Sequence, residues 1–195
     1  LRRSPKLWYD TIKTVLASLG LHSSKTSPCL FTGIIIPGSA PLHLGLYVDD
    51  FVYFSPDAQV EQRFEDLFSQ HFPVEFMGIA THFLGLHIQW RDEEDGNLFV
   101  HLSQSAYIDE VLDKHGLSNA NPVQTPYRSG THVDTVDGET SDTITTKYLS
   151  IVGSLGWLAN MTRPDLSTIH NLLAQYSSKP TSGHLQAATY VLQYL

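Results

Sequence analysis

The sequence has one cysteine and no long apolar run, and both shortages restrict what kind of protein it can be. Cys29 has no partner for an internal disulfide, which fits a reducing compartment. No apolar run approaches the ~18 residues that a membrane span needs. The basic N-terminus is not followed by the apolar region of a secretion signal. We therefore expect a soluble protein that is neither secreted nor inserted in a membrane.

Charged residues are also scarce, at 16% of 195 residues against 42% hydrophobic residues. This composition excludes a disordered chain and is rich enough to bury a core. The ten histidines form no His-x-x-x-His pair and have no cysteine neighbour at zinc spacing, so they predict no zinc site. Because the first residue is not Met and helical patterning continues to Leu195, we expect a piece of a longer polypeptide.

Positive charge is in short supply and unevenly placed. The net charge is -8, yet the first 25 residues carry +4, because five basic residues stand there against Asp10 alone. The acidic total argues against a nucleic-acid partner, since domains that bind phosphates are usually basic or carry a basic face. The basic front segment suits a phosphate backbone, although a solvated helix face is the more frequent explanation.

Paired carboxylates stand between two apolar runs. The run 42–48 leads into Asp49 and Asp50, and a second run, 51–54, follows at once. Two extended segments of this kind predict a hairpin that holds paired negative charge at its bend. A divalent cation relieves the repulsion between such carboxylates, and Mg²⁺ prefers their hard oxygen atoms. The alternative is an ordinary surface turn, where Asp is common.

The rest of the chain alternates short strands and helices before it becomes wholly helical. Apolar spacing and helix stops predict helices over 4–20, 57–68 and 103–116, strands over 29–36 and 42–54, and a hairpin from 83 to 102. Residues 118–146 are dominated by Ser, Thr, Asp, Asn, Pro and Gly and predict an exposed linker. Three apolar stripes with a break at 162–165 predict helices over 147–195.

Five motifs together resemble the reverse transcriptase of copia-type LTR retrotransposons. Their order and spacing match over essentially the whole chain. They are Leu-Arg-Arg-Ser-Pro-Lys-Leu-Trp-Tyr at 1–9, Tyr-Val-Asp-Asp at 47–50, Phe-Leu-Gly-Leu-His-Ile at 83–88, Leu-Ser-Gln-Ser-Ala-Tyr at 102–107, and the run 148–159 with Thr-Arg-Pro-Asp at 162–165.

This resemblance implies an RNA-directed DNA polymerase that uses Mg²⁺, with Mn²⁺ as a possible substitute, in template-directed nucleotidyl transfer by two metal ions. Asp49 is then a catalytic, metal-binding aspartate, and Asp50 is its neighbour in the same catalytic and metal-binding corner. Tyr47 is expected to lie against the primer and template.

The resemblance assigns nucleic-acid contacts to two further segments. Arg2, Arg3 and Lys6 are expected to meet phosphates. Leu84 and Gly85 belong to the hairpin that grips the primer end, where Gly85 permits close backbone approach. The implied partners are an RNA or DNA template with a DNA primer, deoxynucleoside triphosphates, and the upstream palm and fingers and downstream ribonuclease H of the same polyprotein, without a membrane.

The expected fold class is α+β: the distal half of a polymerase palm, with antiparallel strands and helices, followed by a helical thumb and connection region. The expected divisions are a palm portion at 1–102, a thumb-like helix at 103–117, the linker at 118–146 and a helical connection region at 147–195. An intracellular location, cytoplasmic or nuclear, goes with this family.

Two alternatives to an active enzyme fragment stay open. The family's site needs another aspartate from an earlier strand, which would precede Leu1, and Arg3 stands where many relatives have Gln. A catalytically inert retroelement remnant that binds nucleic acid or a partner is therefore one alternative. An unrelated Asp-Asp metal hydrolase is the other, although no further motif in the sequence supports it.

Overall fold

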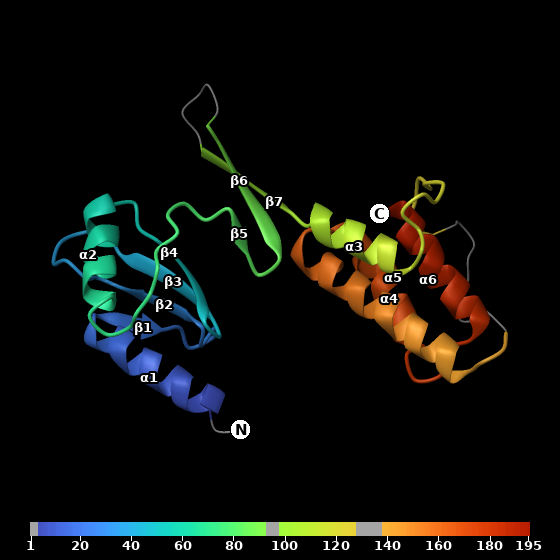
Figure 1. Ribbon diagram of the computed structural model, residues 1–195, viewed down its shortest axis with the longest axis horizontal. Helices are drawn as coiled ribbons and strands as arrows, with labels where there is room; N and C mark the ends of the chain where they lie inside the picture. Colours follow the sequence, from blue (N-terminus) through green and yellow to red (C-terminus); the bar gives the residue numbers. More distant parts are fainter. Residues whose placement is uncertain (1–3, 93–97, 128–137) are drawn as a thin grey trace. The chain divides into compact units, whose positions relative to one another are not determined.

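A computed structural model describes residues 4–92, 98–127 and 138–195. The chain divides into two compact units, Leu1–Ala80 and Thr81–Leu195. Each contains an antiparallel sheet and helices, so the fold is mixed α and β, in agreement with the α+β class predicted from the sequence (Figure 1). Among the described helices, none combines the length and apolar character needed to cross a membrane.

The first unit is a four-stranded antiparallel sheet with two helices. Helix α1 (Ser4–Ser18) is followed by β1 (Leu21–Ser23), β2 (Leu30–Gly33), β3 (Leu42–Tyr47), β4 (Asp50–Phe54) and α2 (Ala58–Phe68). The strands pair in the order β1-β2-β3-β4, as neighbours along the chain. The predicted helix at the front and the predicted hairpin at the Asp-Asp corner are both confirmed, whereas β1 is an additional short strand.

Alternation along β3 determines which face of this sheet is buried. Leu42, Leu44 and Leu46 are buried, whereas His43 and Tyr47 between and beyond them are exposed. Both helices pack on the leucine face, because one apolar cluster joins these leucines to buried residues of each helix. The helical members of that cluster are Ile12 and Leu16 of α1 and Val60, Phe64 and Phe68 of α2.

Two glycines allow α1 to turn closely into the sheet. Gly20 ends the helix with a φ of 89°, a conformation that costs glycine little. A Cβ on Gly33 of β2 would lie only 1.9 Å from the Gly20 carbonyl oxygen, so a larger residue does not fit there. This contact explains why the helix can be followed immediately by an edge strand.

The second unit joins a three-stranded sheet to a helical bundle. Its strands are β5 (His82–Phe83), β6 (Leu86–Asp92) and β7 (Leu98–Ser103), paired in that order, which confirms the hairpin predicted at 83–102. The helices are α3 (Ser105–Lys114), α4 (Asp142–Met161), the short 3-10 helix η2 (Pro164–Leu166), α5 (Ser167–Ala174) and α6 (Ser182–Tyr194).

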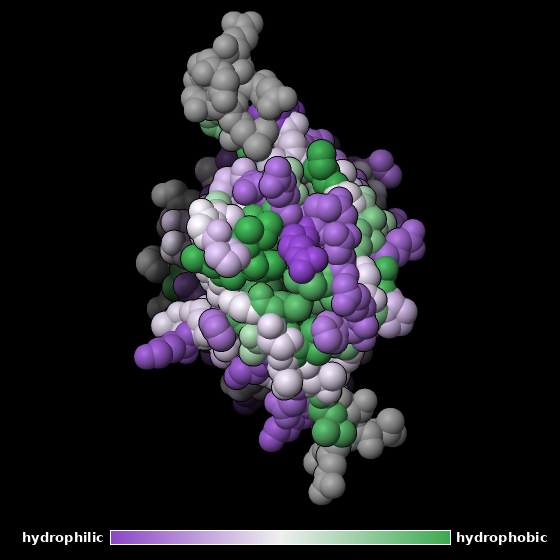
Figure 2. All heavy atoms as spheres, turned by 90° about the vertical axis from the view of Figure 1, so that its left-hand side faces the viewer, coloured by the Kyte–Doolittle hydropathy of each residue, from purple (hydrophilic) through white to green (hydrophobic). Residues whose placement is uncertain are grey.

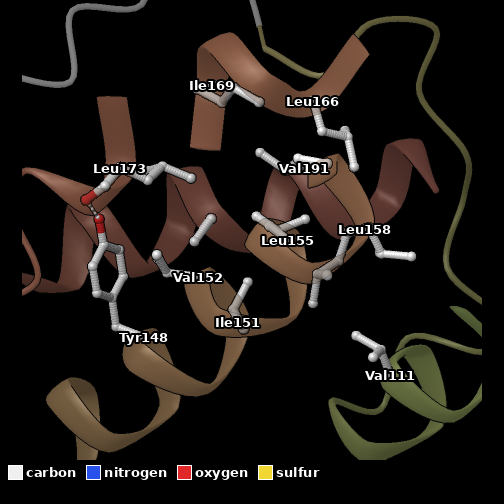
Figure 3. Packing of buried hydrophobic residues seen from close by; sticks show 13 residues of the cluster. Val111, Tyr148, Ile151, Val152, Leu155, Leu158, Leu166, Ile169, Leu173 and Val191 are labelled. Atoms are coloured by element: carbon white, nitrogen blue, oxygen red, sulfur yellow. Dashed lines mark hydrogen bonds between the residues drawn. The ribbon is translucent and has the colours of Figure 1, made fainter. Parts of the chain in front are cut away.

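The helices of this unit enclose the second apolar core. Figure 3 shows side chains of α4 meeting those of η2, α5 and α6, with Val111 of α3 beside them. The Tyr148 hydroxyl donates to the Leu173 carbonyl at 2.6 Å, and burial raises the pKa of this hydroxyl to about 12. Its polar group is therefore satisfied inside an otherwise apolar core.

The helix boundaries refine two predictions. Helix α4 begins at Asp142, inside the segment 118–146 predicted as linker, because the Ser141 hydroxyl caps it by accepting the Ile144 N–H at 3.2 Å. Helix α3 begins two residues after the predicted start at Ser103, whose hydroxyl accepts the Ser105 N–H at 3.2 Å, and has Gln104 at its N-cap position. The Thr-Arg-Pro-Asp motif ends α4, as predicted.

That motif is held by its own polar contacts. Arg163 pairs with Asp165 at 2.8 Å, and its guanidinium lies over the Tyr194 ring, 5.1 Å from the centroid. The Arg163 side chain lowers the pKa of the Asp165 carboxyl. The Thr162 hydroxyl donates to the buried Gln104 side chain at 2.7 Å. The motif thus stabilises the break between α4 and the following helices.

Candidate metal and nucleic-acid site

The Asp-Asp corner is a two-residue hairpin loop between β3 and β4. Tyr47 pairs with Asp50, which leaves Val48 and Asp49 as the central residues of the turn. Val48 has a φ of 54°, whereas Asp49 is not among the residues with positive φ. A positive φ at the first central position alone is the pattern of a type II′ turn, which normally carries glycine there.

The conformation of Val48 is strained. A β-branched residue at positive φ is a genuine outlier, and such backbone strain costs of order 1–3 kcal/mol. The Val48 side chain is 60% exposed, so burial contributes little to holding it. Other contacts must therefore keep the turn in this conformation.

One such contact comes from α1. The Trp8 indole Nε1 donates to the Val48 carbonyl oxygen at 2.7 Å. The Trp8 ring also packs edge-on against Phe72, with 5.3 Å between ring centroids. The bond to the Val48 carbonyl joins residues 40 positions apart and has no signal in the local sequence pattern.

The turn presents its carboxylates in different directions. Asp50 pairs with Tyr47 on the face of the sheet opposite the leucine core, and Tyr47 is 56% exposed. Asp49, in the loop itself, is exposed and also borders a cavity of about 330 Å³ in the first unit. The cavity is otherwise lined by Trp8, Ile12, Phe51, Phe68, Phe72, Pro73 and Val74.

Strand β4 is anchored to α2 by buried polar contacts. The Tyr53 hydroxyl donates to the Glu65 carboxylate, and burial, assisted by this bond, raises the pKa of Tyr53 well above its usual value. Glu61 accepts the Ser55 N–H at 2.9 Å. Phe51 packs edge-on against Phe68, with 5.2 Å between centroids. The strand that begins at Asp50 therefore has a rigid support.

One face of this unit mixes polar and apolar side chains. Figure 2 shows hydrophilic and hydrophobic side chains interleaved on the side that faces the viewer. Lys6 is exposed on α1, two residues before Trp8. Arg2 and Arg3, also predicted to meet phosphates, lie outside the described residues.

Leu84 and Gly85 form the loop of a second tight hairpin, in the other unit. Phe83 pairs with Leu86, and the two loop residues have φ values of 52° and 74°, as in a type I′ turn. A Cβ on Gly85 would have no atom within 4 Å. Here the positive φ favours glycine, and the close approach of this backbone to a primer stays a prediction.

The described residues bring two carboxylates together at the turn, and these are the residues expected from the sequence to bind a metal ion. Asp49 and Asp50 are adjacent, exposed carboxylates, which suits a hard divalent cation with remaining water ligands. Within the described ranges, no group of three or more His, Cys, Asp or Glu side chains could hold a metal ion. The corner by itself thus supplies two carboxylates and fits a cation that receives further ligands from elsewhere.

The family to which this fold and corner belong is shown by comparison with known proteins. Residues 1–129 match the family model of the reverse transcriptase (RNA-dependent DNA polymerase). The chain therefore belongs to the reverse transcriptase family, and the similarity to retrotransposon polyproteins confirms the copia-type resemblance seen in the motifs.

Individual relatives come from plants and yeast. The retrovirus-related Pol polyprotein from transposon RE1 of Arabidopsis thaliana is 34% identical over 195 residues, which is 100% of this chain and 13% of that protein. The polyprotein from transposon TNT 1-94 of Nicotiana tabacum is 27% identical over 200 residues, 100% of this chain and 15% of that protein. A putative transposon Ty5-1 protein of Saccharomyces cerevisiae is 29% identical over 196 residues, 100% of this chain and 61% of that protein.

The chain thus spans only a small part, 13%, of the Arabidopsis polyproteins that it matches. No solved structure matches it.

Proposed function

We propose that this chain is the distal half of a polymerase palm and the helical thumb and connection region of a copia-type reverse transcriptase. The observation that carries the proposal is the tight β3–β4 turn. It holds the consecutive residues Asp49 and Asp50 at the end of a sheet whose leucine face is covered by α1 and α2. The opposite face carries the exposed side chain of Tyr47 next to Asp50.

In this proposal Asp49 and Asp50 hold divalent metal ions. Bound Mg²⁺ supplies charge that stabilises the attacking and leaving oxygens of nucleotidyl transfer. The two carboxylates of this chain would bind and orient the ions, and the tight turn would fix the backbone conformation of the two aspartates. The ligands still missing come from an aspartate upstream in the polyprotein.

The nucleic-acid partners follow from the same placement. A DNA primer on an RNA or DNA template lies on the open face of the sheet, with Tyr47 against it, and deoxynucleoside triphosphates approach the corner. Lys6, with Arg2 and Arg3, neutralises backbone phosphates. The hairpin loop at 84–85 contacts the primer end. Residues 1–102 act as the palm portion, 103–117 as a thumb helix, and 147–195 as the connection toward ribonuclease H.

The test restores the polymerase. The chain is fused in frame behind the segment that precedes the matched region in the Arabidopsis RE1 polyprotein, and primer extension on poly(rA) with oligo(dT) is measured with Mg²⁺. We expect synthesis that falls at least about a hundredfold in Asp49→Asn, beyond the loss usual for a group that merely supports a metal ligand.

The matched control is Asp66→Asn, which removes an exposed carboxylate of α2 in the same unit. It should leave synthesis within about twofold. A folded fusion that makes no DNA would contradict the proposal and favour the inert remnant, for which the net charge of -8 is the motivating observation.

A further inference from the structure

The strained turn at the Asp-Asp corner is contacted by Trp8, a residue of the motif at 1–9 that was not expected to act at the corner. Val48 keeps a φ of 54° although its side chain is 60% exposed. Neither the residue type nor core burial explains this conformation. The β3–β4 ladder fixes Tyr47 and Asp50 on either side, but the rotation of the peptide groups within the two-residue loop needs a further constraint.

The Trp8 side chain meets that requirement. Its indole N–H donates to the Val48 carbonyl at 2.7 Å, and this carbonyl belongs to the peptide group that joins Val48 to Asp49. Because the peptide group is planar, fixing the direction of this carbonyl also fixes the orientation of the N–H and Cα of Asp49. A side chain 40 residues away in the sequence thus sets the orientation of a carboxylate at the corner.

Trp8 is itself firmly placed. Its ring packs edge-on against Phe72 at 5.3 Å between centroids, and Ile12, one turn along α1, is buried in the core. The neighbouring Tyr9 hydroxyl donates to the Pro28 carbonyl at 2.8 Å, which ties α1 to the loop before β2. The donor that holds the turn is thus part of the rigid framework of the unit.

We propose that Trp8 is a positioning residue for the metal corner: its indole N–H holds the peptide between Val48 and Asp49 and so presents the Asp49 carboxylate to a divalent cation. This inference rests on the metal role proposed above for Asp49 and Asp50. The proposal assigns the positioning role to the indole N–H, whereas the ring of Trp8 packs on Phe72.

The experiment uses the complete 195-residue chain labelled with ¹⁵N. Trp8→Phe keeps an aromatic ring against Phe72 and removes the donor. Manganese(II) is the probe, and broadening of the Asp49 and Asp50 amide resonances is followed as it is added. We expect Trp8→Phe to raise the half-broadening concentration about fivefold, the factor that corresponds to the net contribution of one hydrogen bond.

A rescue variant separates positioning from packing. Glycine adopts the first position of a type II′ turn without strain, so Trp8→Phe combined with Val48→Gly should return the manganese titration to within about twofold of the unmodified chain. Trp157→Phe, on α4 in the other unit, is the matched control and should change nothing.

A second measurement does not depend on metal. Relaxation dispersion should reveal microsecond-to-millisecond exchange at residues 47–50 in Trp8→Phe, absent from the unmodified chain and reduced again by Val48→Gly. An unchanged turn in Trp8→Phe, or no rescue by glycine, overturns the inference. If manganese leaves the Asp49 and Asp50 resonances of the unmodified chain unchanged, the proposed metal role fails instead, and the dispersion measurement still decides the role of Trp8.

Discussion

Replacing Val48 by glycine tests the strain in the Asp-Asp turn directly. The substitution releases a positive-φ conformation that costs a β-branched residue about 1–3 kcal/mol. Against this, glycine loses about 0.5–1 kcal/mol more backbone entropy on folding. The lost side chain is 60% exposed, so its burial contributes less than about 1 kcal/mol. The terms nearly cancel, and a small net stabilisation is the central expectation.

A second valine-to-glycine substitution, on the adjoining strand, serves as the reference for the effect of strain. Val52→Gly removes the same side chain from β4, where φ is not positive. It incurs the entropic and burial losses without any relief of strain. Because Val52 is also more buried than Val48, the free energy of unfolding should be at least about 1–3 kcal/mol higher for Val48→Gly than for Val52→Gly.

Urea unfolding of the first unit is the assay. Trp90→Phe and Trp157→Phe, both in the second unit, leave the fluorescence of Trp8 as the reporter of the first unit. Both valine variants are compared in this background. Equal losses of stability in the two glycine variants would refute the reasoning, because they would mean that the Val48 backbone stores no strain.

Four further substitutions test the packing of the two units. Gly33→Ala places a Cβ 1.9 Å from the Gly20 carbonyl oxygen and should lower the free energy of unfolding of the first unit by about 1–3 kcal/mol in the same urea titration. Gly153→Ala, in open space on α4, should raise that of the second unit by about 0.5–1 kcal/mol in a urea titration that keeps Trp157 as the reporter. Burial lowers the pKa of His115, so below pH about 6.5 the unfolded state binds more protons than the folded state. The thermal stability of the second unit should therefore decrease as the pH is lowered below about 6.5, and it should decrease less steeply in His115→Gln. Tyr148→Phe removes one hydrogen bond to the Leu173 carbonyl, which still accepts the Tyr176 N–H at 3.0 Å, and should cost about 0.5–1.5 kcal/mol in thermal unfolding. An unchanged midpoint would contradict the packing in Figure 3.

Local patterns in the sequence account well for the elements around the corner. Apolar spacing from Leu7 to Leu19 predicts α1, and the alternation before Asp49 predicts β3 with its hairpin partner. These features depend on residues close together in the chain, where helix and strand periods apply. The Asp-Gly sequence at 95–96, a pair typical of hairpin turns, lies within the predicted hairpin but outside the described residues.

Contacts between distant segments could not be predicted in this way. The bond from Trp8 to the Val48 carbonyl needs the relative placement of α1 and the turn, which periodicity does not contain. The positive φ values of Val48 and Leu84 are equally hidden, since neither residue type favours them. The roles of Arg2, Arg3, Lys6, Leu84 and Gly85 in binding nucleic acid stay predictions.

The central claim is that Asp49 acts as a metal ligand in template-directed DNA synthesis. The most direct measurement is magnesium-dependent primer extension by the restored polymerase, with Asp49→Asn beside Asp66→Asn. The account predicts synthesis that is lost in the first variant and kept in the second. Synthesis that survives Asp49→Asn would contradict it.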